Sequence, residues 1–362
     1  MVALLRKILL FLLITGNITT TGFSQTTYAE KLGYKKGERV LILHVDDAGM
    51  SYDSNEGAIQ ALEKGVANSV SVMMPCPWVP GFIKYLKQHP QVDAGLHLTL
   101  TSEWINYRWA PLAGTAGTPT LIDTEGALWP SVADVVQHAK ADEVETEIRA
   151  QLARAQTMGF QPTHLDSHMG TLFASPAFLE RYIKVGVENQ IPVMLPGGHN
   201  TLLLQQLQNE TIAELKSQGK YQAGMAVPTP AIATQAKAIG EKVWQAGLPV
   251  LDDLHNTSYG WHLPATTPVT PENLRQFKVQ QYIAGIKGLK PGVTMMIMHC
   301  TAPTEVFQHI SNSGPTRHGD LLAMLDPGLR KTLQDEKIVL TTWRELMQRR
   351  SQVTNQQLEQ KR

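Results

Sequence analysis

The sequence predicts an α/β fold, namely a distorted (β/α) barrel of the TIM-barrel type with mostly parallel strands. Short apolar runs alternate along the chain with amphipathic, helix-like segments, an order typical of βα units around a parallel sheet. About eight such units over roughly 310 residues favour a barrel over an open sheet. Several apolar runs end in acidic or histidine side chains, and the carboxyl ends of parallel strands are where such folds place their chemistry.

The expected strands are continuous runs of Val, Ile, Leu and Met, which is the pattern of strands buried on both faces. They lie at 39–46, 68–75, 92–98, 163–167, 191–195, 222–227, 248–251, 293–299 and 337–341.

The segments between these runs show the 3–4 residue spacing of amphipathic helices. In 142–158, Val144, Ile148 and Ala155 fall on one face, and Gly159 follows as a stop signal. Comparable helical patterns occupy 54–65, 176–189, 201–217, 230–245, 271–288 and 320–335.

Residues 1–25 have the pattern of a secretory signal peptide, with Arg6 and Lys7 before a short apolar block and small residues near a cleavage site. The block is shorter than the roughly 20 residues of a bilayer span, although an uncleaved anchor is the alternative. We therefore expect a periplasmic or secreted protein with no stable membrane span after signal cleavage. The expected divisions are a linker at 26–37, a barrel domain at 38–348 and a polar tail at 349–362.

The composition is that of an ordinary globular enzyme with a formal net charge of zero, so nucleic acid is not an expected partner. The two cysteines, Cys76 and Cys300, follow apolar runs and are expected as buried free thiols, with a disulfide as the alternative in an exported protein. Residues 103–131 form a long Gly/Pro-rich stretch that contains Trp104, typical of a lid or binding wall. The oligomeric state stays open, a homo-oligomer included.

Two adjacent acids, Asp46 and Asp47, end the first apolar run, and Gly49 follows them. Neighbouring carboxylates at the end of a buried strand repel each other and lose their hydration. A divalent cation is the usual compensation for such a pair.

Three histidines also end apolar runs: His97, His168 and His299. Each alone is more typical of a hydrogen-bonded core histidine. In a parallel sheet they would converge with the acid pair on one rim, and that combination indicates a site.

Within the apolar run that ends near residue 168, His164, Asp166 and His168 share one strand face because side chains alternate along a strand. His168 is nearest the rim and is the expected metal ligand, with Asp166 orienting it from below. A structural polar pair of His164 and Asp166 is an equal alternative.

One carboxylate and two imidazoles would leave open positions on a Zn²⁺-like ion, as catalytic sites do. Such an ion lowers the pKa of bound water to about 7 and polarises a carbonyl. The second acid of the pair could then act as general base, and His299 could protonate the leaving group. Zn²⁺ or Mg²⁺ is the expected ion, and Co²⁺ or Mn²⁺ would also suit these ligands.

Three motifs occur in order, Asp46-Asp47-x-Gly49, the run 95–99 around His97, and His164-x-Asp166-Ser167-His168. They resemble the YdjC/ChbG-like carbohydrate deacetylases, which are related to the NodB-type polysaccharide deacetylases. The segments 296–299, 317–325 and 342–346 are similar to the C-terminal half of that family, so the resemblance covers roughly 38–348.

The resemblance implies a distorted β/α barrel that holds one divalent metal through Asp47, His97 and His168. It implies hydrolysis of a linear amide, the N-acetyl group of an amino sugar in an oligosaccharide or glycan, with release of acetate. Asp46 would be the base, and His299 would protonate the departing amine.

The chain departs from the family pattern at three positions near the site. Family members often have Asn where this chain has His44 and Phe where it has Ala48, and a further His where it has Met169. A chitooligosaccharide substrate is therefore not carried over to this chain.

Other residues are expected to bind substrate or support the ligands. Asp252 and Asp253 form a second strand-end acid pair, expected on the same rim, with direct metal binding as the alternative. Trp261 could stack on a sugar or simply pack a loop. Arg317 could pair with Asp46 and keep it ionised, or lie on the surface. His44, Asp166 and Trp104 complete this set.

Two other functions remain open at this point. The first is a glycan-binding protein on an inactive deacetylase scaffold, which would predict the loss of Asp47, His97 or His168. The second is a metal-dependent phosphoesterase or other ester hydrolase, which would usually require two metals and more carboxylates.

Overall fold

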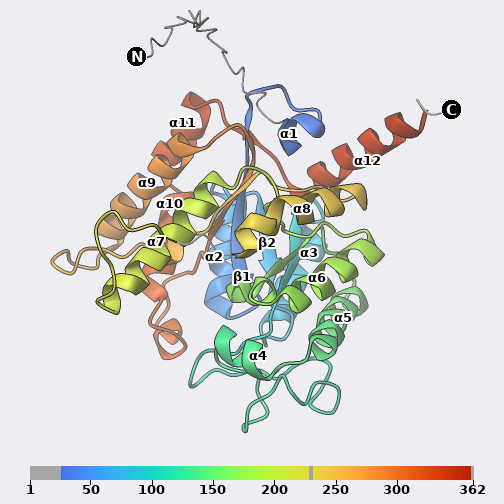
Figure 1. The fold of residues 1–362 in the computed structure, drawn as a ribbon. Coiled ribbons are helices and arrows are strands. Elements are labelled where there is room, and N and C mark those ends of the chain that lie inside the picture. The colour runs from blue at the N-terminus through green and yellow to red at the C-terminus, as the bar shows by residue number, and fades with distance from the viewer. Residues whose placement is uncertain (1–25, 228–230, 360–362) are drawn as a thin grey trace, which may run out of the picture.

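The computed structural model describes residues 26–227 and 231–359 of the chain, so the predicted signal peptide lies outside the described residues. A seven-stranded parallel sheet forms the centre, in the order β4-β3-β2-β1-β6-β5, with β7 paired to β1. Helices surround the sheet on its outer side (Figure 1). The strands are β1 Arg39–Ala48, β2 Ser69–Val72, β3 Ala94–Leu98, β4 Leu165–Ser167, β5 Asp253–His255, β6 Gly292–Met298 and β7 Val339–Leu340.

The sheet curls into a distorted barrel, as the sequence predicts. The segment 193–196 connects its two edges, because Leu165 pairs with Val193 and Pro196 pairs with Leu251, both in parallel. The predicted strands at 191–195 and 248–251 are reduced to these bridges. β7 occupies the first part of one side of β1 and β2 the later part, with His44 opposite Ser69.

The predicted strand at 222–227 is wrong. This segment connects α7 to α8, and most of its side chains are exposed. Gly219 and Gly224 adopt positive φ angles of 67° and 82°, which turn the chain and prevent an extended strand.

The helices cover the barrel, and 168–173, 258–260 and 306–309 form short 3₁₀ turns η1, η2 and η3. The predicted helix at 320–335 is two helices, because Asp326 caps a new helix that starts at Pro327. The α-helices are α1 Tyr28–Lys31, α2 Tyr52–Glu63, α3 Val79–Gln88, α4 Val132–His138, α5 Ala141–Thr157, α6 Pro176–Asn189, α7 Thr201–Ser217, α8 Ala231–Gln245, α9 Pro271–Gly288, α10 Gly314–Met324, α11 Pro327–Asp335 and α12 Trp343–Glu359.

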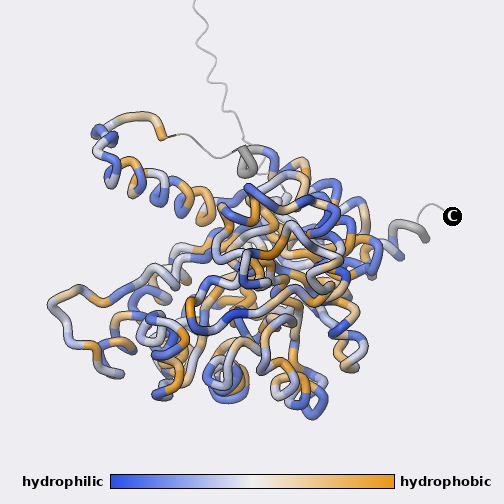
Figure 2. Tube along the Cα trace, turned by 90° about the horizontal axis from the view of Figure 1, so that it is seen from below, coloured by the Kyte–Doolittle hydropathy of each residue, from blue (hydrophilic) through white to orange (hydrophobic). Residues whose placement is uncertain are grey.

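The side chains of β1 show how the barrel divides its interior. Val40 and Ile42 pack with Trp343 in one apolar cluster, whereas Leu41 and Leu43 pack in a larger cluster with other buried side chains. The alternation along β1 gives His44 and Asp46 the same orientation as Val40 and Ile42. The apolar stretches gather along the central strands, and hydrophilic residues alternate with them on the outer helices (Figure 2). Cys76 and Cys300 are buried free thiols, as predicted.

Residues 26–37 are not a free linker. Tyr28 and Ala29 in α1 are buried, and their backbone N–H groups donate to the Asp252 carboxylate at 2.8 and 3.0 Å. Asp252 also accepts from the N–H of Val293, near the amino end of β6, at 2.9 Å. The predicted place of Asp252 on the catalytic rim is therefore wrong, because this carboxylate anchors α1 at the opposite end of β6.

The predicted polar tail is largely helical, since α12 continues to Glu359. Its Arg350 guanidinium lies over the Trp244 ring at 4.1 Å and donates to the Trp244 carbonyl at 2.6 Å. Within the part of the chain that the structure describes, no helix has the length and apolar character needed to cross a bilayer.

The anchoring of α1 yields a stability prediction. Asp252→Asn should lower the free energy of unfolding by about 2 kcal/mol, because the new amide N–H₂ cannot accept the hydrogen bonds that the carboxylate receives. Urea unfolding followed by circular dichroism measures this change. Asp335→Asn, in an exposed pair with Lys331, is the control and should change stability by less than about 0.5 kcal/mol. Equal midpoints for the two variants would show that α1 does not depend on Asp252.

Candidate metal and catalytic site

The end of β1 carries both acids of the first motif to the same place. Regular alternation directs Asp46 toward the barrel interior, and Asp47 would then face outward. Asp47 instead adopts a left-handed backbone with φ of 68°, and the pairing of β1 with β2 is irregular between Val45 and Ala48. A non-glycine residue with such a φ costs on the order of 1–3 kcal/mol and is typical of functional sites. This kink allows the adjacent residues Asp46 and Asp47 to face the same site.

Two histidines from neighbouring strands converge on Asp47. His97 Nε2, from β3, lies 3.3 Å from Asp47 Oδ1, and His168 Nδ1, after β4, lies 3.3 Å from the same oxygen. Ligand atoms of the three side chains all lie within 4.8 Å of one another. Asp47 Oδ1 is buried without a hydrogen-bond partner among the described residues. Two nitrogens and one oxygen in this arrangement fit a small divalent cation such as Zn²⁺.

A carboxylate holds the remaining nitrogen of each imidazole. His97 Nδ1 lies 2.7 Å from Asp166 Oδ1, and His168 Nε2 lies 3.0 Å from Glu103 Oε1. Metal-binding histidines usually direct their second nitrogen to a carboxylate or carbonyl, which fixes the ring and its tautomer. The outer contacts therefore match a metal-binding role for both rings.

These contacts correct one expectation and add one residue. Asp166 orients His97 and not His168, because His97 and Asp166 are direct partners in the register of β3 and β4. Glu103, which supports His168, was missed by the sequence analysis. Its signal was an acid at the start of the Gly/Pro/Trp-rich segment 103–131, but nothing in the sequence connects it to His168.

Arg317 supplies a fixed positive charge to this group of acids. Its Nη1 lies 2.6 Å from Asp47 Oδ2, and its Nε donates to Ser313 Oγ at 2.8 Å. The expected pairing with Asp46 is wrong, because α10 directs Arg317 to the neighbouring Asp47. Arg317 thus occupies one oxygen of Asp47 and leaves Oδ1 facing the two imidazoles.

The pKa values show strong electrostatic coupling. Burial opposes ionisation of Asp47, but Arg317 and the two imidazoles hold the pKa of its carboxyl well below the usual range. Burial likewise opposes a charge on His168, but Glu103 and Asp47 raise its pKa to about 9. The acids therefore favour positive charge at this point, either as a proton on the imidazole or as a bound cation.

A second polar group lies beneath the triad and is closed to the cavity. His44 contacts Ser69 and Ser71 through its two nitrogens at 2.9 and 3.0 Å, and its Nε2 is 3.0 Å from Asp166. His164 stacks on Trp343 with ring centroids 5.2 Å apart. His44, His164 and Asp166 could also approach one ion, but both nitrogens of His44 are already engaged. We interpret this group as the support of the triad.

His299 and Asp46 line the cavity together. His299 Nε2 lies 3.9 Å from Asp46 Oδ2, and burial lowers the pKa of His299. The backbone N–H of His299 donates to Asp320 at 3.1 Å, and the buried Lys278 also donates to Asp320 at 2.8 Å. Burial thus favours the neutral form of the His299 imidazole, and the contacts of Asp320 hold its backbone next to the Asp46 carboxylate.

Of three residues that were predicted to contact substrate, only one lines the cavity. Asp253 caps α7, because it accepts from the N–H groups of Leu202 and Leu203 at 2.9 and 3.2 Å, so its expected role at the rim is wrong. Trp104 packs against Trp109 with centroids 5.5 Å apart and does not line the cavity. Trp261 does line it.

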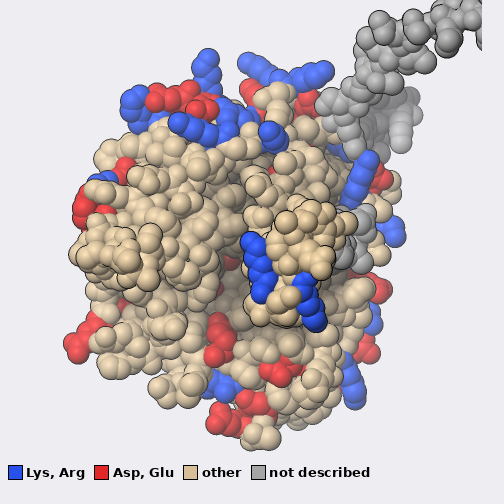
Figure 3. Space-filling model, turned by 60° about the vertical axis from the view of Figure 1, so that its left-hand side comes forward, with Lys and Arg blue, Asp and Glu red and all other residues tan. Residues whose placement is uncertain are grey.

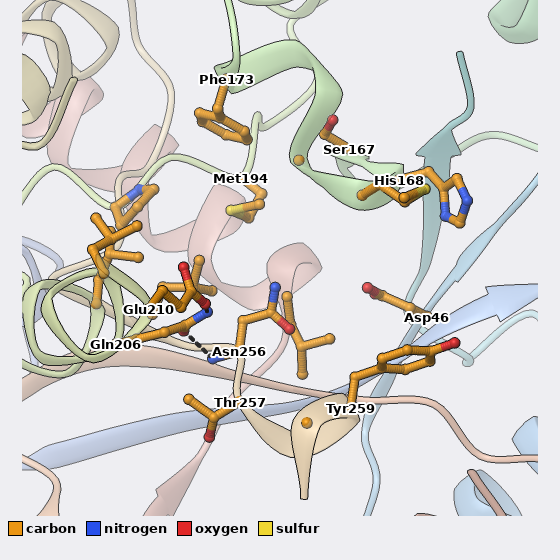
Figure 4. Close-up of a pocket in the computed structure, with 18 of the residues that line it drawn as sticks. Asp46, Ser167, His168, Phe173, Met194, Gln206, Glu210, Asn256, Thr257 and Tyr259 are labelled. Atoms are coloured by element: carbon orange, nitrogen blue, oxygen red, sulfur yellow. Dashed lines mark hydrogen bonds between the residues drawn. The ribbon is translucent and has the colours of Figure 1, made fainter. Parts of the chain in front are cut away.

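A cavity of about 790 Å³ opens from these catalytic candidates. In the close-up, Asp46 and His168 stand on one side, Gln206 and Glu210 on the other, and Met194 between them (Figure 4). On the surface, the face shown in Figure 3 is hollowed near its middle, and the side chains around the hollow are mostly uncharged, with acidic side chains along its lower edge. The volume is within the usual range for a site that encloses a small molecule.

Fold and site together define a class of protein, a parallel β/α barrel with a buried Asp–His–His group that opens into a substrate-sized cavity. The model of the YdjC-like protein family matches residues 40–335, and the chain belongs to this family. A carbohydrate deacetylase of Thermus thermophilus is 30% identical over 315 residues, which cover 87% of this chain and 96% of that protein. A chitooligosaccharide deacetylase of Yersinia enterocolitica is 31% identical over 134 residues, 36% of this chain and 49% of that protein.

One solved structure shares the fold over nearly its whole length. It is a crystal structure of a candidate cellobiose-phosphate cleavage protein from Enterococcus faecalis, with a TM-score of 0.63 and 17% identity. The match covers 85% of this chain and 99% of that chain. At this level of identity the similarity shows the fold alone.

The triad predicts metal binding that can be measured directly. After dialysis against Zn²⁺, the protein should retain one ion per chain, and His97→Ala should weaken its binding by more than about 100-fold because one of three ligands is lost. Elemental analysis and isothermal titration calorimetry measure both quantities. His89→Ala, a partly exposed histidine 3.6 Å from Glu63, is the control and should bind like the wild type. Unchanged affinity in His97→Ala would place the ion elsewhere.

The contact between Glu103 and His168 yields a separate prediction. Glu103→Gln should reduce metal affinity about 10- to 100-fold, because a neutral amide polarises the imidazole less than a carboxylate. Competition with a chromogenic chelator measures the affinity. Glu125→Gln, in the same loop and with its side chain paired to Arg108, is the matched control. A Glu103→Gln affinity equal to that of the control would remove Glu103 from the site.

Proposed function

We propose that the chain is a metal-dependent hydrolase that removes the N-acetyl group from an amino-sugar-containing oligosaccharide or glycan and releases acetate. The observation that carries this proposal is the open Asp47–His97–His168 group, with Asp46 and His299 beside it in the same cavity. The carbohydrate deacetylase of Thermus thermophilus, which is similar along almost its whole length, supports the sugar substrate.

Asp47, His97 and His168 are the residues that would hold the cation. When bound, a divalent ion polarises the amide carbonyl and lowers the pKa of a neighbouring water. Asp166 and Glu103 keep the two imidazoles oriented, and Arg317 keeps Asp47 ionised. These contacts reduce the rearrangement that cation binding would require.

Asp46 and His299 provide the proton transfers. Asp46 accepts a proton from the attacking water, whose oxygen forms the new bond to the acyl carbon. The bond between that carbon and the nitrogen then breaks, and the proton that Asp46 took from the water passes through His299 to the departing amine, so that both side chains return to their starting charge. The distance of 3.9 Å between His299 Nε2 and Asp46 Oδ2 supports a role for both groups at one amide. The products are acetate and a free amino sugar.

Acetate release tests this proposal. Wild-type protein loaded with Zn²⁺ should release acetate from N-acetylated oligosaccharides, and a chelator should stop the reaction. Asp46→Asn should reduce kcat by about 10²- to 10⁴-fold because the proton acceptor is lost. An enzymatic acetate assay measures the rates.

A second variant and its control help to interpret a negative result. His299→Gln should also lower kcat, whereas His309→Gln, on the surface in η3, should not. Metal-loaded protein that releases no acetate from any N-acetylated sugar would contradict the proposal. Hydrolysis of phosphate or carboxylic esters by the same preparation would then identify an ester hydrolase, and sugar binding without hydrolysis would identify a glycan-binding protein.

A further inference from the structure

The cavity continues beyond the reacting groups into a chamber with mainly apolar walls. Its lining includes Leu179 from α6, Met194 and Leu195 from the bridging segment, Leu203 from α7 and Ile239 from α8. These elements are distant in sequence, yet all present aliphatic side chains to the space that begins at Asp46 and His168. The chamber is therefore a continuation of the catalytic cavity.

Such walls are a poor match for an oligosaccharide. Each sugar hydroxyl that leaves water without a hydrogen-bond partner costs on the order of 1–3 kcal/mol. Leucine, isoleucine and methionine side chains provide no such partners. The polar residues Gln206 and Glu210 lie at the far side of the cavity from Asp46, and Asn256 lies between the two sides (Figure 4).

The helix α7 also contributes apolar side chains that the protein does not fully bury. It has no buried residue, although Leu202, Leu203, Leu204 and Leu207 all lie in its first two turns. Leu203 and Leu207 line the chamber. In the tube view, the helical segment 201–217 stands off the body and alternates hydrophobic and hydrophilic residues (Figure 2). An apolar ligand in the chamber would complete the burial of these leucines.

We propose that the substrate is an amphipathic amino-sugar conjugate whose aliphatic chain occupies this chamber. This inference rests on the proposed function, because it places the sugar amide at Asp46 and the chain beyond it. The chain has two possible sources, a long N-acyl group that is itself removed or an alkyl aglycone that remains on the sugar. Both present the same chemistry to Leu203 and Leu207.

The expected gain in affinity follows from burial of the aliphatic chain. Each methylene transferred from water to an apolar site contributes about 0.8 kcal/mol, which corresponds to about fourfold in affinity. Affinity should therefore rise about two- to fourfold per methylene until the chain reaches the polar side at Gln206 and Glu210.

Two series of probe compounds distinguish an N-acyl chain from an alkyl aglycone. The first is N-acyl glucosamines with acyl chains of two to ten carbons, for which kcat/KM is measured by release of the free amine. The second is n-alkyl β-glucosaminides of the same lengths, which contain no amide. Their dissociation constants are measured by calorimetry below the micelle concentration. A rise in the first series alone identifies the acyl chain, and a rise in the second identifies the aglycone.

A pair of variants tests whether the chamber is responsible. Leu203→Gln with Leu207→Gln should flatten the dependence on chain length, and because α7 has no buried residue the variant should fold. Leu204→Gln changes a leucine of the same two turns that does not line the cavity, and it should keep the wild-type dependence. Circular dichroism checks the fold of both variants.

The outcomes distinguish this inference from the proposed function. Acetate release with no chain-length dependence in either series would overturn the chamber proposal and leave the deacetylase function intact. Chain-dependent binding without hydrolysis of any N-acyl sugar would support the chamber and contradict the hydrolase. A dependence that is the same in the Leu203/Leu207 double variant as in Leu204→Gln would place the chain elsewhere and overturn the proposal.

Discussion

Several carboxylates are buried together at one end of the barrel, and the arrangement around them depends on how their charge is neutralised. Asp47 and Asp166 are each no more than 1% exposed. An isolated buried carboxylate is strongly disfavoured, so positive or hydrogen-donating groups must surround these acids. Arg317 contacts Asp47, and His44 and His97 contact Asp166. The proposed metal-binding triad lies where the imidazoles of His97 and His168 both face one oxygen of Asp47.

This constraint accounts for local features that would otherwise be unfavourable. Asp47 adopts a left-handed backbone, and Met169 and Gly170, directly after His168, do so as well, with φ angles of 52° and 65°. Each conformation turns the chain immediately beside a triad residue. The backbone is strained where Asp47 and His168 leave their strands. A site of this kind remains in place because the surrounding packing determines it.

The two ends of the cavity differ in the chemistry of their side chains. The charged end holds Asp46, the triad and His299, with contacts of 3.3 to 3.9 Å between neighbouring side chains. The apolar end is formed by side chains from α6, α7, α8 and the bridging segment.

The sequence by itself determined the barrel and the convergence of Asp46, Asp47, His97, His168 and His299. Apolar runs specify buried parallel strands, and parallel strands bring their carboxyl ends to one rim. The tertiary structure alone decided the pairings: Glu103 with His168, Asp166 with His97, Arg317 with Asp47 and Asp252 with α1. These depend on strand register and helix packing between distant residues, as with the 270 positions that separate Arg317 from Asp47. A strand-end acid such as Asp253 looks catalytic in the sequence, and only the position of α7 shows that it is a helix cap.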